Sequence, residues 1–162
     1  GILLSPGPGI PEEAGDLMAA IGQIVRQRIP VLGICLGHQA LARAFGAELR
    51  QLSAPLHGHP TMLTVTDAGD LLLQKVAPPL IVGRYHSWVV DPDSMPEELI
   101  ASSHDETGHI MSFYHRNLPI HGVQFHPESC ISNCGSALIR NWLATCCRHP
   151  LRERSLRKFP DL

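Results

Sequence analysis

The chain of 162 residues has few aromatic side chains, 5% of the total, and few charged ones, 17%. Its formal net charge of -2 leaves no basic excess that would attract a nucleic acid or an anionic membrane surface. It also lacks any apolar run of the length that a membrane span needs. The composition therefore predicts an ordinary globular domain with its own core, which binds neither nucleic acid nor membrane.

The cysteines do not form a disulfide framework. They are five, an odd number, and their spacings are not those of a small disulfide-rich domain. We therefore expect free thiols in a reducing, cytoplasmic setting. The chain also begins with Gly1 and not with an initiator methionine. Residues 2–4 are typical of the end of a buried strand. We expect further sequence upstream of Gly1.

One cysteine stands at an abrupt change of local pattern. Residues 30–34 are typical of a buried strand, Cys35 follows, and a helix is predicted at once over residues 36–44. Gly33 and Gly37 flank the cysteine two residues away on each side, as in a nucleophile elbow, where the turn leaves no room for neighbouring side chains. A thiol there also lies at a helix N-terminus, which favours the thiolate. The alternative is a small buried hydrophobe in a tight turn.

The segments around this cysteine predict an α/β fold. Residues 2–4 end in the stiff loop Ser5-Pro6-Gly7-Pro8-Gly9, whose glycines expose backbone N–H groups, and a helix is predicted over residues 11–28. The order strand, helix, strand, helix implies a parallel sheet. Further strands are predicted at 48–52, 62–66, 80–85, 99–102, 110–115 and 119–125, a short helical or irregular segment at 67–74, and a helix at 133–147. One domain over residues 1–147 and a basic, loosely ordered tail over 148–162 complete the prediction.

A nucleophilic thiol needs a base, and the base needs an orienting group. His126 ends an apolar strand, Pro127 stops further pairing, and Glu128 lies two residues on, so its side chain projects to the same side as His126 in extended chain. The carboxylate could hold one imidazole nitrogen while the other faces Cys35. The alternative for His126 and Glu128 is a solvent-facing pair at a strand end.

Other polar residues carry weaker signals. His38 is a rival base, but its place in the first helical turn favours a structural role. His57 and His59 lack a third metal ligand nearby. A second set of candidate zinc ligands lies near the C-terminus: Cys130, Cys134, Cys146, Cys147 and His149. They could form a site only if the last helix folded back, so we favour buried or free thiols for the four cysteines. We therefore expect no metal.

Three motifs taken together resemble class I glutamine amidotransferase domains. They are Ser5-Pro6-Gly7-Pro8-Gly9, the stretch Gly33-Ile34-Cys35-Leu36-Gly37-His38-Gln39, and Gly122-Val123-Gln124-Phe125-His126-Pro127-Glu128-Ser129. Arg84-Tyr85-His86-Ser87-Trp88 and His57-Gly58 resemble, more narrowly, the glutaminase components of anthranilate synthase and aminodeoxychorismate synthase. His59 departs from these relatives, which usually have lysine there.

The resemblance implies an open, mostly parallel, flavodoxin-like sheet flanked by helices, with an antiparallel extension. The family's first strand–helix–strand segment is absent from this sequence. For the site, the resemblance implies that Cys35 attacks the side-chain amide of L-glutamine, assisted by His126, which Glu128 orients. Backbone N–H groups of Gly7 and Leu36 would form the oxyanion hole. The residues that would hold glutamine are Gly7, Pro8, Gly9, Gln39, Ser87 and Trp88. Without the resemblance, Gln39 would be interpreted as a solvated helix residue.

The resemblance also implies a partner. Ammonia would pass through a channel to a chorismate-binding synthase subunit, and the glutaminase step would need no cofactor, with Mg²⁺ expected only on that subunit. Anthranilate synthesis, and hence tryptophan, is the leading hypothesis. The alternatives are aminodeoxychorismate synthesis for folate, or an inactive remnant that only binds a partner. A cysteine peptidase using the same elbow is disfavoured by the Gly-Pro loop and by residues 85–88.

Overall fold

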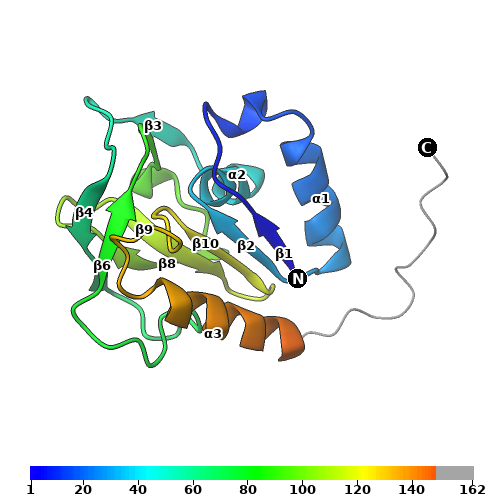
Figure 1. Cartoon of the computed structure of the whole chain (residues 1–162). Helices are drawn as coiled ribbons and strands as arrows, with labels where there is room; N and C mark the ends of the chain where they lie inside the picture. The colour runs from blue at the N-terminus through cyan, green and yellow to red at the C-terminus, as the bar shows by residue number, and fades with distance from the viewer. Residues whose placement is uncertain (149–162) are drawn as a thin grey trace.

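The computed structural model describes residues 1–148 of the chain (Figure 1). Its main feature is a six-stranded sheet in the order β1-β2-β10-β9-β8-β5. The bounds are β1 Ile2–Leu4, β2 Val31–Ile34, β10 Ile120–Val123, β9 Ile110–His115, β8 Leu99–His104 and β5 Thr64–Val65. Apart from Arg148, the predicted basic tail lies outside the described residues.

The sheet is parallel at one end and antiparallel at the other. The pairings of β1 with β2 and of β2 with β10 are parallel, whereas β10–β9, β9–β8 and β8–β5 are antiparallel. The predicted α/β fold with an antiparallel extension is confirmed, and in the described residues the extension is larger than a mostly parallel sheet implies. The reason is local, because a short connection at residues 116–119 joins β9 directly to β10 as a hairpin.

Two small sheets accompany the main one. In the first, β3 (Leu49–Gln51) pairs with β7 (Trp88–Val90), and in the second, β4 (His59–Met62) pairs with β6 (Ile81–Arg84). The strand β7 was not predicted from the sequence. Its three residues are held by pairing with β3, which lies almost forty residues earlier in the chain, so no local pattern indicates it. Residues 67–74 form turns, as the irregular alternative predicted.

The helices lie on both faces of the main sheet (Figure 1). They are α1 (Leu17–Gln27), α2 (Leu36–Ala44) and α3 (Gly135–Arg148), with short 3-10 turns at η1 (Pro11–Glu13) and η2 (Pro92–Ser94). The helix predicted over 11–28 is thus divided, since Gly15 adopts a positive φ of 58° between η1 and α1. None of the helices within residues 1–148 combines the length and the hydropathy needed to cross a bilayer.

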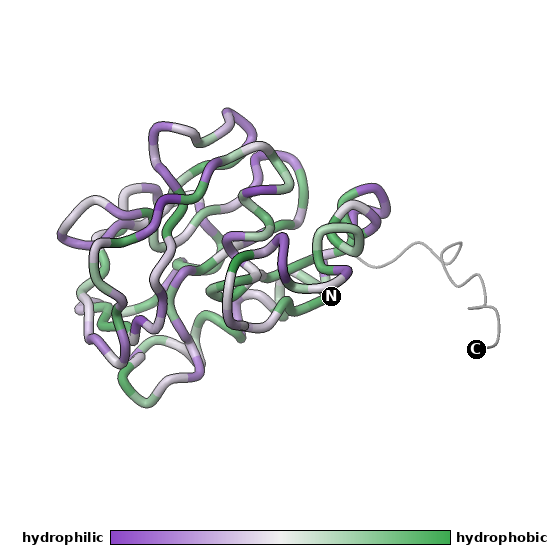
Figure 2. The backbone as a smooth tube through the Cα atoms, turned by 90° about the horizontal axis from the view of Figure 1, so that it is seen from above, coloured by the Kyte–Doolittle hydropathy of each residue, from purple (hydrophilic) through white to green (hydrophobic). Residues whose placement is uncertain are grey.

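Alternation along β2 divides the core in two. Val31 packs with α1 and α2 on one face, and Leu32 packs with Leu138 and Trp142 of α3 on the other. This is the period-two pattern of a strand buried on both faces. Figure 2 shows hydrophilic stretches in several of the outer loops.

Glycines allow helices to start directly against the sheet. A Cβ on Gly33 would overlap backbone atoms of Gly37, and a Cβ on Gly37 would lie 2.5 Å from the carbonyl oxygen of Leu4. At the start of α3, a Cβ on Gly135 would overlap the backbone of Pro127. Both helices therefore begin in contact with the segments that carry the sequence motifs, a contact that only glycine permits.

We expect Gly33→Ala to lower the free energy of unfolding by at least about 2 kcal/mol, because the added methyl meets backbone that cannot rotate away. Urea unfolding measures the difference. Gly22→Ala in α1 is the matched control, since its Cβ would meet only the flexible end of Arg26 at 3.5 Å, and alanine there should leave stability unchanged or raise it by up to about 1 kcal/mol. Equal stability of the two variants would contradict the prediction.

Candidate active site

The site begins at Cys35, between β2 and α2. This residue has φ 51° and ψ -102°, a conformation that costs a side-chain-bearing residue about 1–3 kcal/mol. Two backbone hydrogen bonds hold it there. Cys35 N–H donates to the Val123 carbonyl at 2.8 Å, and its own carbonyl accepts from Gln39 N–H at 3.1 Å. The strand–turn–helix geometry is that of a nucleophile elbow.

The thiol opens on a pocket of about 300 Å³. All six residues expected to hold glutamine line this pocket together with Cys35: Gly7, Pro8, Gly9, Gln39, Ser87 and Trp88. Three further lining residues were not assigned from the sequence: Gln51, Tyr85 and His86. Gln51 arrives through the pairing of β3 with β7, where it lies opposite Trp88, and nothing in its local sequence marks it.

Gln39 is buried, with 3% of its surface exposed, so it is not the solvated helix residue that its sequence position alone would indicate. Its side-chain nitrogen donates to the Trp88 carbonyl at 2.8 Å and to Oε1 of Gln124 at 3.0 Å. Both amide hydrogens are therefore used within the protein. What Gln39 can offer a ligand is its carbonyl oxygen, an acceptor for an ammonium or amide group.

The histidine–carboxylate pair is formed. Nδ1 of His126 lies 2.7 Å from Oε1 of Glu128, and since an ionised carboxylate only accepts, Nδ1 carries the proton. Nε2 is buried and has no hydrogen-bond partner among residues 1–148, Cys35 included. The His126 ring packs edge-on against Tyr85, at 4.9 Å between centroids, which places it beside the pocket wall.

Electrostatics keep the resting thiol protonated. Burial raises the pKa of Cys35 to about 11, and the charge of Glu128 acts in the same direction, whereas the Leu36 N–H and the Gln124 amide lower it. The thiol is therefore protonated at pH 7. Nucleophilic attack by Cys35 therefore requires a base, which Nε2 of His126 is free to be.

The two expected oxyanion donors are neighbours. A Cβ on Gly7 would lie 2.7 Å from Cδ2 of Leu36, so the Gly-Pro loop faces the first residue of α2 across the mouth of the elbow.

His38, the rival base, does not line the pocket. It is fully buried, its ring lies 4.6 Å from that of Phe113, and burial lowers its pKa to about 3. This placement in the core fits the structural role expected for it.

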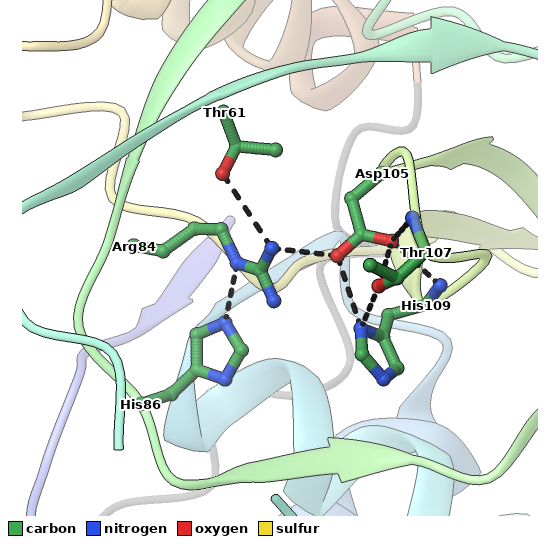
Figure 3. A network of polar contacts seen from close by, with 6 residues as sticks. All are labelled: Thr61, Arg84, His86, Asp105, Thr107 and His109. Carbon is green, nitrogen blue, oxygen red and sulfur yellow. Dashed lines mark hydrogen bonds and ion pairs between the residues drawn. The ribbon is translucent and has the colours of Figure 1, made fainter. Parts of the chain in front are cut away.

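A buried ion pair supports the pocket wall (Figure 3). Nη1 of Arg84 donates to Oδ2 of Asp105 at 2.6 Å, and the two side chains are 4% and 0% exposed. Nε of Arg84 donates to Nε2 of His86 at 3.2 Å, so the single proton of neutral His86 is on Nδ1. Burial and the Arg84 charge lower the pKa of His86 to about 4, which keeps this wall uncharged at neutral pH.

The carboxylate of Asp105 is in turn held by the turn that follows it. Thr107 donates from its backbone N–H and its hydroxyl, at 2.9 and 2.8 Å, and His109 donates from its backbone N–H at 2.8 Å. Burial opposes ionisation of Asp105, but these hydrogen bonds, the His109 ring and the Arg84 charge outweigh it and lower the pKa to about 2.

Metal ligands are not gathered in the described part of the chain. No group of three or more His, Cys, Asp or Glu side chains within residues 1–148 is arranged to hold an ion. His57 and His59 are both exposed, and all five cysteines are free thiols. The candidate ligand His149 lies outside the described residues.

Comparison with known proteins identifies the family. Residues 1–146 match the profile of the family described as glutamine amidotransferase class-I. The chain belongs to this family. It is 44% identical over 147 residues to anthranilate synthase component 2 of Mycobacterium tuberculosis, and 43% identical over 142 residues to aminodeoxychorismate synthase component 2 of Escherichia coli. The first alignment covers 91% of this chain and 62% of the relative, and the second covers 88% and 74%.

The fold of this amidotransferase domain agrees with its family. A crystal structure of a Thermoplasma acidophilum protein assigned to GMP synthase superposes with a TM-score of 0.80 at 27% identity, covering 90% of this chain and 72% of the other. The chain spans about 62% of the length of the mycobacterial relative.

We expect Asp105→Asn to destabilise the domain by about 3 kcal/mol at pH 7, because it leaves the buried Arg84 charge unpaired. The folded pKa of Asp105 lies below its ordinary 3.8, so its contribution is complete above pH 4 and is lost as pH falls toward 2. Denaturant unfolding at several pH values should show that the free energies of unfolding of the variant and of wild type converge as pH falls over that range. Glu106→Gln, at an exposed neighbouring position, should change stability by less than about 0.5 kcal/mol at any pH.

Proposed function

We propose that the chain is a glutaminase that hydrolyses L-glutamine through a thioester on Cys35. The observation that carries the proposal is the pocket itself: a thiol on a strained elbow opens on a cavity of about 300 Å³ whose lining includes every residue expected to hold glutamine. No Lys, Arg, Asp or Glu of the described residues is among those that line it. Such a neutral cavity suits a small zwitterion recognised by hydrogen bonds.

The proposed reaction has two stages, formation of the thioester and its hydrolysis. Nε2 of His126 takes the thiol proton while Sγ of Cys35 bonds to the amide carbon of the substrate side chain. Glu128, 2.7 Å from Nδ1, holds the ring and stabilises the imidazolium that forms. In this proposal the backbone N–H groups of Gly7 and Leu36 donate to the developing oxyanion. His126 returns the proton to the leaving nitrogen, ammonia departs, and a water activated by the same histidine cleaves the thioester to give glutamate and the free thiol.

The ammonia is proposed to serve a chorismate-converting synthase subunit that binds this chain and receives ammonia through a channel. Supporting this, relatives with 44% and 43% identity are named as second components of anthranilate synthase and aminodeoxychorismate synthase. These near-equal identities favour neither pathway. We take anthranilate, and so tryptophan, as the first assignment and aminodeoxychorismate for folate as the alternative, both in the cytoplasm. The glutaminase step uses no cofactor, and Mg²⁺ belongs to the partner subunit.

One observation favours a second candidate, a partner-binding protein without glutaminase activity. In the resting structure the thiol is protonated, with a pKa of about 11, and His126 makes no hydrogen bond to it. In that arrangement Nε2 does not contact the thiol whose proton it would take. The glutaminase requires that substrate binding or the partner bring Nε2 to the sulfur.

We expect Cys35→Ala to abolish glutamine-dependent product formation by the assembled synthase, since no other thiol of the described residues lines the pocket. Synthesis from added ammonium salts should persist, because the partner's site is untouched. Steady-state assays of the complex with each nitrogen source measure both. Cys130→Ala, at an exposed thiol, is the matched control and should retain both activities. Loss of both activities in an intact Cys35→Ala complex would contradict the assignment.

We expect the glutamine-analogue electrophile 6-diazo-5-oxo-L-norleucine to label Cys35 and excess L-glutamine to protect it. Peptide mass spectrometry locates the adduct. Cys134 is the internal control, since it is similarly buried but lies outside the pocket. Absence of the Cys35 adduct, tested with and without the synthase partner, would favour the partner-binding candidate instead.

A further inference from the structure

Gln124 touches the nucleophile and was given no role by the sequence. It follows β10 directly, and the parallel register pairs Val123 with Ile34, so Gln124 lies alongside Cys35. The hydrogen bond from Cys35 N–H to the Val123 carbonyl extends this pairing, and Gln124 N–H donates to the Met111 carbonyl at 2.9 Å. The side chain is fully buried, with 0% exposed. Its backbone is therefore fixed on both sides at the level of the thiol.

The side-chain amide is oriented by a directed series of hydrogen bonds. The Trp88 carbonyl and Oε1 of Gln124 both accept from the side-chain nitrogen of Gln39, at 2.8 and 3.0 Å. Because Oε1 of Gln124 takes this hydrogen, its nitrogen faces the other way and donates to Sγ of Cys35 at 3.7 Å. The amide of Gln124 thus presents a donor to the sulfur.

We propose that Gln124 is a catalytic residue whose side-chain N–H stabilises the thiolate of Cys35, and that Gln39 sets the direction of that donor. The inference rests on the proposed glutaminase and adds a residue to it. The environment makes such a donor necessary: Cys35 is 5% exposed, and the nearby Glu128 carboxylate disfavours a second negative charge. A hydrogen bond to a charged acceptor in a buried site is roughly twice as strong as one between neutral groups.

The same contacts connect the nucleophile with the substrate-binding wall. Gln39 donates both hydrogens, one to the wall at Trp88 and one to Gln124, so a displacement of Trp88 changes the donor at the sulfur. A purely structural Gln124 would serve only to satisfy Gln39. If Gln124 stabilises the thiolate, its replacement lowers the reactivity of Cys35, whereas a purely structural Gln124 can be replaced without that effect.

The test is the pH dependence of Cys35 alkylation by iodoacetamide in the full chain, followed by peptide mass spectrometry from about pH 7 to about pH 10.5, a range that approaches the raised pKa of the thiol. Gln124→Met retains the length of the side chain and removes the donor. We expect its Cys35 alkylation to be about tenfold slower at each pH, the effect of removing a hydrogen bond to a charged acceptor. Cys130 and Cys147, both exposed, are internal controls whose rates should not change.

Gln124→Glu separates the two roles and covers the case in which the methionine variant does not fold. Its ionised carboxylate retains an oxygen for Gln39, loses the donor to sulfur and adds a negative charge beside it, so we expect Cys35 alkylation at least as slow as in Gln124→Met. In glutaminase assays kcat should fall at least about tenfold while KM stays within about threefold. Wild-type alkylation rates in a folded Gln124→Glu protein would overturn the proposal. Alkylation needs no turnover, so this result is distinct from a failure of the glutaminase assignment, which would appear as an inactive wild-type complex.

Discussion

The direct contact of the first turn of α2 with β1 and β2 is the constraint on which the site depends. Gly33 and Gly37 permit this contact, and it forces the chain to turn within one residue. That residue is Cys35, held at a positive φ by hydrogen bonds to β10 and to α2 itself. The strain is stored at the nucleophile, and packing over both faces of the sheet compensates for it. Any loosening of the helix–sheet contact would let the thiol withdraw from the pocket.

Charge is kept behind the pocket and away from it. The Arg84–Asp105 pair is almost fully buried. The residue that lines the cavity in front of it is His86, whose neutral ring accepts a hydrogen bond from Arg84. The amide of Gln39 lines the cavity, and the fully buried amide of Gln124 lies behind it, against the thiol. Neutral donors can be oriented without raising the energy of a buried site by several kcal/mol, as an unpaired charge would. The carboxylate that acts on the nucleophile, Glu128, keeps 58% of its side chain exposed.

Sequence patterns predicted the features that depend on neighbours along the chain. The elbow around Cys35 and the pairing of His126 with Glu128 two residues later are of this kind, as are most strand positions. Features that depend on strand adjacency were missed. Gln124 meets Cys35 only because β10 lies beside β2, and Gln51 meets the pocket only because β3 pairs with β7. Arg84 and Asp105 lie twenty-one residues apart, so no local pattern indicates that they pair, and the fold brings both into the interior.

The start of α3 has a consequence for motion. Gly135 lies so close to Pro127 that no side chain fits between them, which joins the helix mechanically to the segment carrying His126 and Glu128. The base is therefore not on a free loop. The N–H of His126 donates to the Gly83 carbonyl of β6 at 3.0 Å, so the base is held between β6 and the first turn of α3. A ligand or protein that bound α3 would therefore act on the helix that packs against Pro127, next to the base, without entering the pocket.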